Sequence, residues 1–105
     1  MNLKEYQEKA AEFAVYESSL YPVLALAEEV GELTTFFAKQ ARGDFKEMNF
    51  RMKKLLRKEI GDVLWQVSAI ASDQGWNLEE IAIENLDKLQ DRKDRRLIKG
   101  TGDER

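Results

Sequence analysis

Two pairs of acidic residues are the part of this sequence best suited to chemistry. In "LAEEVGEL", Glu29 is followed three positions later by Glu32, and in "KEIGDV" Glu59 is followed at the same interval by Asp62. On a helix, residues three apart lie about 60° from each other, so each pair would present both carboxylates on one face. Clustered carboxylates bind hard divalent cations, and all-oxygen ligation favours Mg²⁺ or Mn²⁺ over zinc or copper. Together the two pairs predict the two halves of a metal site.

The helices expected to carry these pairs begin near Pro22 and Asn49. Each pair lies to the same rotational side of its helix's apolar seam, whose centres we take as Val30 and Ile60. If the two apolar stripes pack antiparallel, the helix sides that carry the acidic pairs face each other. The positions of the two pairs along their helix axes also agree, to about one residue's rise, ~1.5 Å. We therefore expect four carboxylates to converge, where they would shift one another's pKa values unless a cation lies between them.

A solvated acidic face is the alternative interpretation of either pair alone. Glu28 lies outside the paired spacing and is interpreted as a neighbouring acid. Each motif also contains a glycine, Gly31 or Gly61, which costs about 1 kcal/mol of helix propensity relative to alanine. A close helix contact or access for a ligand would explain that cost, and the second pair at a matching position favours the metal site.

Composition excludes several other chemistries. The chain has 105 residues with no Cys and no His, which rules out structural zinc fingers, disulfides, thiol nucleophiles and imidazole bases. Its 20 acidic residues outnumber 17 basic ones, so no overall positive charge attracts nucleic acid or an anionic membrane. No apolar run approaches the ~18 residues of a membrane span. We expect one cytoplasmic domain that binds neither nucleic acid nor membrane.

Apolar spacing and capping signals predict an all-α protein, a four-helix bundle without strands. Residues 1–97 are the expected helical domain, and residues 98–105 form a Gly-rich, charged C-terminal tail. The expected helices run from Asn2 to about Glu17, Pro22 to Arg42, Asn49 to Gly75, and Asn77 to about Arg96.

At these motifs the chain resembles the MazG family of all-α nucleoside triphosphate pyrophosphohydrolases, whose pattern is ExxE, a spacer, then ExxD. "YPVLALAEEVGEL", "DVLWQVSAIA" and the ending from Asn85 are similar to a small, single-domain branch of that family. The resemblance implies cleavage of a (deoxy)nucleoside triphosphate to the monophosphate and pyrophosphate, in nucleotide-pool house-cleaning. It also implies a homodimer or homotetramer. The implied metal ligands and catalytic residues are Glu29, Glu32, Glu59 and Asp62, with Mg²⁺ as the cofactor and Mn²⁺ as an alternative.

Further candidates for substrate binding lie on the last two helices. Asn85, Lys88 and Arg92 share a helix face and match the family's "NxxKLxxR" pattern, although an ordinary polar face would look the same. Trp65 could stack on a base, but a tryptophan at this place on a bundle helix is more often part of the core. A basic run before Glu59 is interpreted as a solvated face from which one lysine could meet a triphosphate. That run consists of Lys53, Lys54, Arg57 and Lys58.

Two other functions stay open. A phosphoribosyl-ATP pyrophosphatase-like enzyme would share the metal site and differ in substrate. A non-catalytic helical oligomer or partner-binding module would release no pyrophosphate from any nucleotide. A di-iron bundle is set aside, because such sites add Glu-x-x-His pairs and this chain has no histidine.

Overall fold

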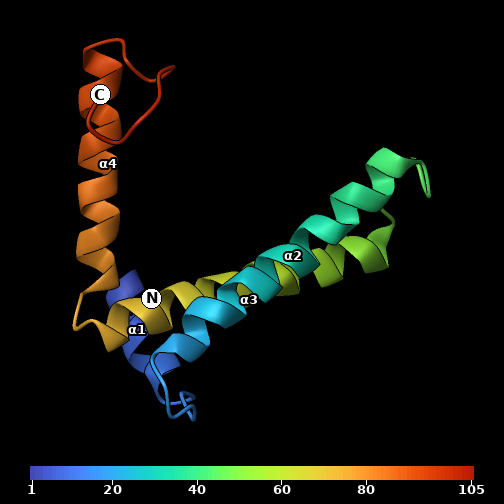
Figure 1. The fold of residues 1–105 in the computed structure, drawn as a ribbon, viewed down its shortest axis with the longest axis horizontal. Helices are drawn as coiled ribbons and strands as arrows, with labels where there is room; N and C mark the ends of the chain where they lie inside the picture. Colours follow the sequence, from blue (N-terminus) through green and yellow to red (C-terminus); the bar gives the residue numbers. More distant parts are fainter.

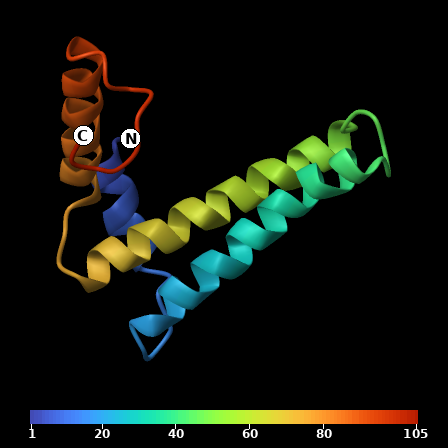
Figure 2. The same cartoon turned by 45° about the horizontal axis from the view of Figure 1, so that its top comes forward.

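The computed structural model describes residues 1–105 and contains four helices and no strand, which confirms the all-α prediction (Figure 1). Helices α2 and α3 form a long antiparallel hairpin (Figure 2). Helix α1 packs on α3 at the end of the hairpin where α2 begins, and α4 contacts α1 and α3 while its length diverges from the hairpin (Figures 1 and 2). The helices are α1 (Leu3–Ala11), α2 (Leu20–Arg42), α3 (Phe50–Asp73) and α4 (Leu78–Asp94).

Three of the four predicted helix starts are confirmed by their caps, whereas α2 begins at Leu20 instead of Pro22 and has no side-chain cap. The Asn2 side chain accepts a hydrogen bond from the Glu5 amide at 2.8 Å in a complete capping box. The Asn49 side chain caps α3 by accepting from the Met52 amide, and the Asn77 side chain caps α4. These asparagines satisfy amides that have no partner within the helix. Local chemistry therefore sets where three of the four helices begin.

Two helices end earlier than predicted. Helix α1 stops at Ala11 instead of near Glu17. The chain beyond it turns away, and the Tyr16 hydroxyl donates to the Asp73 carboxylate on α3 at 2.8 Å. Helix α4 stops at Asp94, because Arg96 adopts a left-handed conformation with φ of 59° that cannot continue a right-handed helix.

The predicted apolar seams are wrong in rotation. Val30 and Ile60, taken as the seam centres, are 42% and 53% exposed. Glu29 and Glu59 are half-buried between α2 and α3, and Ala25 is buried on the α2 side. Each helix carries more apolar surface than one contact can cover, so half-exposed residues remain on one side of the hairpin. This apolar face consists of Val23, Val30, Phe37, Ile60 and Val67.

One chain covers little of its own apolar surface. Ten of 105 residues are buried, and the radius of gyration is 16.8 Å. A compact chain of this length would have a radius of about 13 Å. The open shape follows from the divergence of α4 from the hairpin (Figure 1). No helix is both long enough and apolar enough to cross a membrane.

A buried glutamine holds α1 against the α3–α4 turn. The Gln7 amide donates to Ser72 Oγ at 3.0 Å and to the Trp76 carbonyl at 2.9 Å, and its oxygen accepts from the Leu78 amide at 2.8 Å. Gln7→Leu should lower the free energy of unfolding by about 2–4 kcal/mol, because buried polar groups lose their partners. Urea unfolding measures this loss. The exposed Gln90→Leu is the control, and an equally small change in both variants would contradict the role of Gln7.

Candidate metal centre

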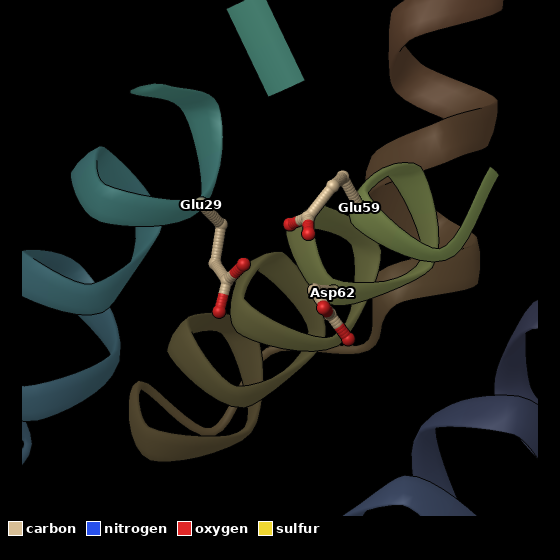
Figure 3. Close-up of side chains that lie close together, drawn as sticks. All are labelled: Glu29, Glu59 and Asp62. Carbon is tan, nitrogen blue, oxygen red and sulfur yellow. The ribbon is translucent and has the colours of Figure 1, made fainter. Parts of the chain in front are cut away.

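Three carboxylates from the middle of the hairpin converge. Glu29 comes from α2, and Glu59 and Asp62 come from successive turns of α3 (Figure 3). One oxygen of each lies within 4.8 Å of the other two. Glu29 and Glu59 are half-buried between the helices, whereas Asp62 is exposed at the edge. The packing of α2 on α3 thus brings acids from the two sequence motifs into a single cluster.

Two oxygens of this cluster lack partners. Glu29 Oε2 and Glu59 Oε2 are buried and accept no hydrogen bond. A buried carboxylate oxygen without a partner is costly, and here two of them lie among further negative charges. No lysine or arginine forms an ion pair with these acids. The donor set therefore fits a hard divalent cation, which prefers carboxylate oxygens and would satisfy both orphaned atoms.

The electrostatics of the cluster agree with this interpretation. Burial is the main reason that the pKa of Glu29 is raised, and the negative charges of Asp62 and Glu32 raise it further. The adjacent carboxylate of Glu59, through its close approach and its negative charge, raises the pKa of Glu32. Ionisation of these neighbouring carboxylates is therefore unfavourable, and a bound cation would offset their repulsion.

The remaining acids of the motif differ in position. Glu32 is exposed, lies beside Glu59 and stands outside the three-oxygen group. Glu28 is also exposed and belongs to no such group. The role of Glu32 as a ligand stays a prediction. The contrast makes Glu28 the natural control residue for substitutions in the cluster.

The sequence interpretation missed Tyr6 as a neighbour of the site. Burial, and then the negative charge of Asp62, raises the pKa of Tyr6, so its hydroxyl lies within electrostatic range of that carboxylate. Helical spacing within α1 indicates only that Tyr6 is one of its apolar positions. Its place beside Asp62 depends on how α1 packs on α3, and spacing within α1 carries no signal of that contact.

The basic candidates on α4 lie against the C-terminal tail. Lys88 Nζ pairs with the Asp103 carboxylate at 3.1 Å, and the buried Arg92 donates through Nη2 to the main-chain oxygens of Gly102 at 3.3 Å and Asp103 at 2.6 Å. The hydrogen bond from Lys88 is the main reason the pKa of Asp103 lies below its usual value. Asn85 is exposed. Substrate binding by Asn85, Lys88 and Arg92 stays a prediction.

Comparison with known proteins identifies the family. The profile of the MazG nucleotide pyrophosphohydrolase domain matches residues 17–97, a span that contains all three converging carboxylates. The chain belongs to the MazG family. The Gene 37 protein of Mycobacterium phage L5 is similar over its whole length and over all of this chain, at 32% identity. Its name states no activity, and no solved structure matches.

MazG membership gives the cluster its chemical context. The family is one of nucleotide pyrophosphohydrolases, and the two acidic pairs of this chain lie on α2 and α3, the helices that form the long hairpin. The antiparallel contact of α2 and α3 therefore brings together acids that are about thirty residues apart in the sequence. A four-residue shift of one helix along the other would move the carboxylates apart by about 6 Å and disperse the cluster.

Removing the charge of the half-buried Glu29 should stabilise the metal-free protein at high pH. The pKa of Glu29 is raised above its ordinary 4.5, so the folded state holds this proton more tightly than the unfolded chain. Between 4.5 and the raised pKa, increasing pH lowers the stability of the metal-free protein. Glu29→Gln removes this penalty. The variant should melt higher than the wild type in EDTA at pH 8, with a smaller gain at pH 5.

The same variant should lose its response to Mg²⁺. In wild-type protein, Mg²⁺ should raise the melting temperature more at pH 8 than at pH 5, because the ion competes with protons for the carboxylates. Differential scanning fluorimetry with Mg²⁺ or EDTA measures both effects. Glu28→Gln should behave as the wild type does. A Glu29→Gln protein that is destabilised in EDTA and still stabilised by Mg²⁺ would contradict the cation site.

Proposed function

We propose that this MazG-family chain is a Mg²⁺-dependent nucleoside triphosphate pyrophosphohydrolase that removes unwanted nucleotides in the cytoplasm. Its reaction cleaves a (deoxy)nucleoside triphosphate to the monophosphate and pyrophosphate. The observation that carries the proposal is the convergence of Glu29, Glu59 and Asp62, with two buried carboxylate oxygens that lack partners. Mn²⁺ has the same preference for oxygen ligands and is the alternative cofactor.

Glu29, Glu59 and Asp62, with Glu32 beside them, are the residues that would hold the ion. When bound, Mg²⁺ would supply neutralisation of phosphate charge and of the pyrophosphate leaving group. Water attacks the α-phosphorus, a new O–P bond forms, and the bond to the β-phosphate oxygen breaks. A carboxylate of the cluster accepts the proton of that water, because the chain contains no histidine to act as base.

The proposed enzyme is a homodimer in which the apolar face is buried against a second copy. Val23, Val30 and Phe37 recur every seven residues on one side of α2, and Ile60 and Val67 continue this face on α3. A two-fold axis would pack two such hairpins into four helices, the closed core that one chain lacks. A homotetramer would add a second contact of this kind. In such an assembly, Asn85, Lys88 and Arg92 of α4 contribute to binding phosphate or sugar.

The proposal is tested by a pyrophosphate-release screen over all nucleoside and deoxynucleoside triphosphates. The expected result is release of pyrophosphate with Mg²⁺ from at least one of them, and no release in EDTA. Phosphoribosyl-ATP is included as a separate substrate, and preference for it would favour the phosphoribosyl-ATP pyrophosphatase-like alternative. Activity that survives EDTA would contradict the metal-dependent mechanism. Absence of release from every substrate would favour the non-catalytic oligomer.

A further inference from the structure

An aromatic groove opens where the loop after α1 meets the hairpin. Phe13, Tyr16, Tyr21 and Trp65 line it. Phe13 and Tyr21 are 64% and 52% exposed, so their rings are accessible to a ligand. The proposed metal site does not use these four residues, which we call the aromatic groove.

Two of the rings are held in place by hydrogen bonds. The Tyr16 hydroxyl donates to the two oxygens of Asp73 at 2.9 and 2.8 Å, and Trp65 Nε1 donates to the Ala10 carbonyl at 3.2 Å. Tyr16 stacks on Tyr21 with centroids 5.6 Å apart and meets Trp65 edge-on at 6.4 Å. A planar ligand would therefore meet a preformed surface, with little loss of side-chain freedom on binding.

The groove lies on the carboxylate side of the hairpin. Trp65 follows Asp62 by three residues on α3, which places it about 60° round and ~4.5 Å further along the helix. On α2, Tyr21 precedes Glu32 by eleven residues and lies within about 20° of it. The apolar face lies on the opposite side of both helices. The aromatic groove therefore begins about one helical turn from the carboxylate cluster.

Basic residues lie on the same side of α3 as the carboxylates, nearer the N-terminus of the helix. Lys54 and Lys58 precede Asp62 at intervals of four residues, so they follow one side of α3 toward its N-terminus. Both line a second groove together with Lys53 and Arg57. Along this side of α3 the order is thus lysines, carboxylates, aromatic rings. A nucleoside triphosphate has the matching order of terminal phosphates, α-phosphate and base.

We propose that the aromatic groove binds the base of the nucleotide substrate, with Trp65 and Tyr21 as its stacking residues and the terminal phosphates directed toward Lys54 and Lys58. This inference rests on the proposed function and adds the orientation of its substrate. Stacking uses the face that every base has, so the groove favours nucleotides over inorganic tripolyphosphate and tolerates several bases.

Trp65 itself can report on occupancy of the groove. The chain has two tryptophans, and Trp76 is 59% exposed and outside the groove, so Trp76→Phe leaves Trp65 as the single tryptophan. We expect a non-hydrolysable deoxynucleoside triphosphate analogue with Mg²⁺ to quench Trp65 emission. Tripolyphosphate with Mg²⁺ should bind without this quenching. Analogue binding, measured by calorimetry, that leaves Trp65 emission unchanged would overturn the proposal.

A substitution separates stacking from phosphate binding. Tyr21→Ala should weaken binding of the analogue by about 10-fold and leave the affinity for tripolyphosphate unchanged. Tyr21→Phe keeps the ring and should bind as the wild type does. The exposed Leu24→Ala, on the neighbouring turn of α2 and outside the groove, is the matched control. Equal affinity of Tyr21→Ala and wild type for the analogue would overturn the stacking role.

These readouts also distinguish failure of the groove from failure of the reaction. Quenching of Trp65 by the analogue without pyrophosphate release from any nucleotide would retain the groove and refute the hydrolase. Pyrophosphate release with unchanged Trp65 emission would retain the hydrolase and refute the groove. Emission that depends on protein concentration and not on nucleotide would assign the groove to a second copy of the chain and overturn the proposal.

Discussion

Glu59→Gln is expected to lower kcat/KM for pyrophosphate release by more than about 100-fold. Glu59 meets both Glu29 and Asp62 in the cluster, and one of its oxygens is buried without a partner. The amide keeps the shape of the side chain but removes its charge. Substitutions that only support metal ligands cost 10- to 100-fold in affinity or activity, so loss of a ligand should cost more. Coupled pyrophosphate detection at saturating Mg²⁺ measures the effect.

Glu28→Gln is the matched control for this prediction. It makes the same chemical change one residue before Glu29, on an exposed side chain outside the cluster. Its kcat/KM should stay within about 2-fold of wild type, as expected for a surface charge. Calorimetric titration with Mg²⁺ should show weaker binding for Glu59→Gln alone. Equal activity of the two variants would remove the carboxylate cluster from the mechanism.

Phe37→Glu should convert the proposed dimer to monomer. Phe37 is 49% exposed in the single chain and is the largest residue of the α2 part of the apolar face. A two-fold interface would bury both copies of the residue, so one substitution places two charges in the contact. The dissociation constant should rise by more than about 100-fold, as for an interface hot spot. Light scattering after size-exclusion chromatography, from about 1 to 100 μM protein, measures the mass.

Leu24→Glu tests whether the effect belongs to the apolar face. Leu24 is 66% exposed, but it follows Val23 and points about 100° away from that residue's direction on α2. It should leave the mass of the wild-type assembly unchanged. A wild-type chain that is monomeric at 100 μM would contradict the dimer. Dissociation by Leu24→Glu and not by Phe37→Glu would place the interface on another side of α2.

Local signals in the sequence determined the secondary structure and its main boundaries. Asn2, Asn49 and Asn77 cap their helices as predicted, because a cap depends on a side chain and an amide two or three residues away. Gly43, with φ of 96°, ends α2 for an equally local reason. The ends of α1 and α4 were missed because a contact between Tyr16 and Asp73 and the backbone of Arg96 decide them.

The sequence also determined which acids could form a site. Helical spacing put Glu59 and Asp62 on one face and predicted that Glu29 would meet them across an antiparallel hairpin, as it does in the structure. The motifs led in the same way to the MazG family. Spacing within a helix is sufficient for this, since it sets the relative direction of side chains whatever the helix packs against.

Only the tertiary structure decided how the helices are rotated and what each residue faces. Val30 and Ile60 lie on the apolar face instead of the hairpin contact, and Glu29 and Glu59 lie half-buried in their place. Both helices have apolar residues over a broad arc, so periodicity alone allowed either rotation. The choice depends on close packing between α2 and α3, where the buried Ala25 permits a contact that larger side chains would prevent.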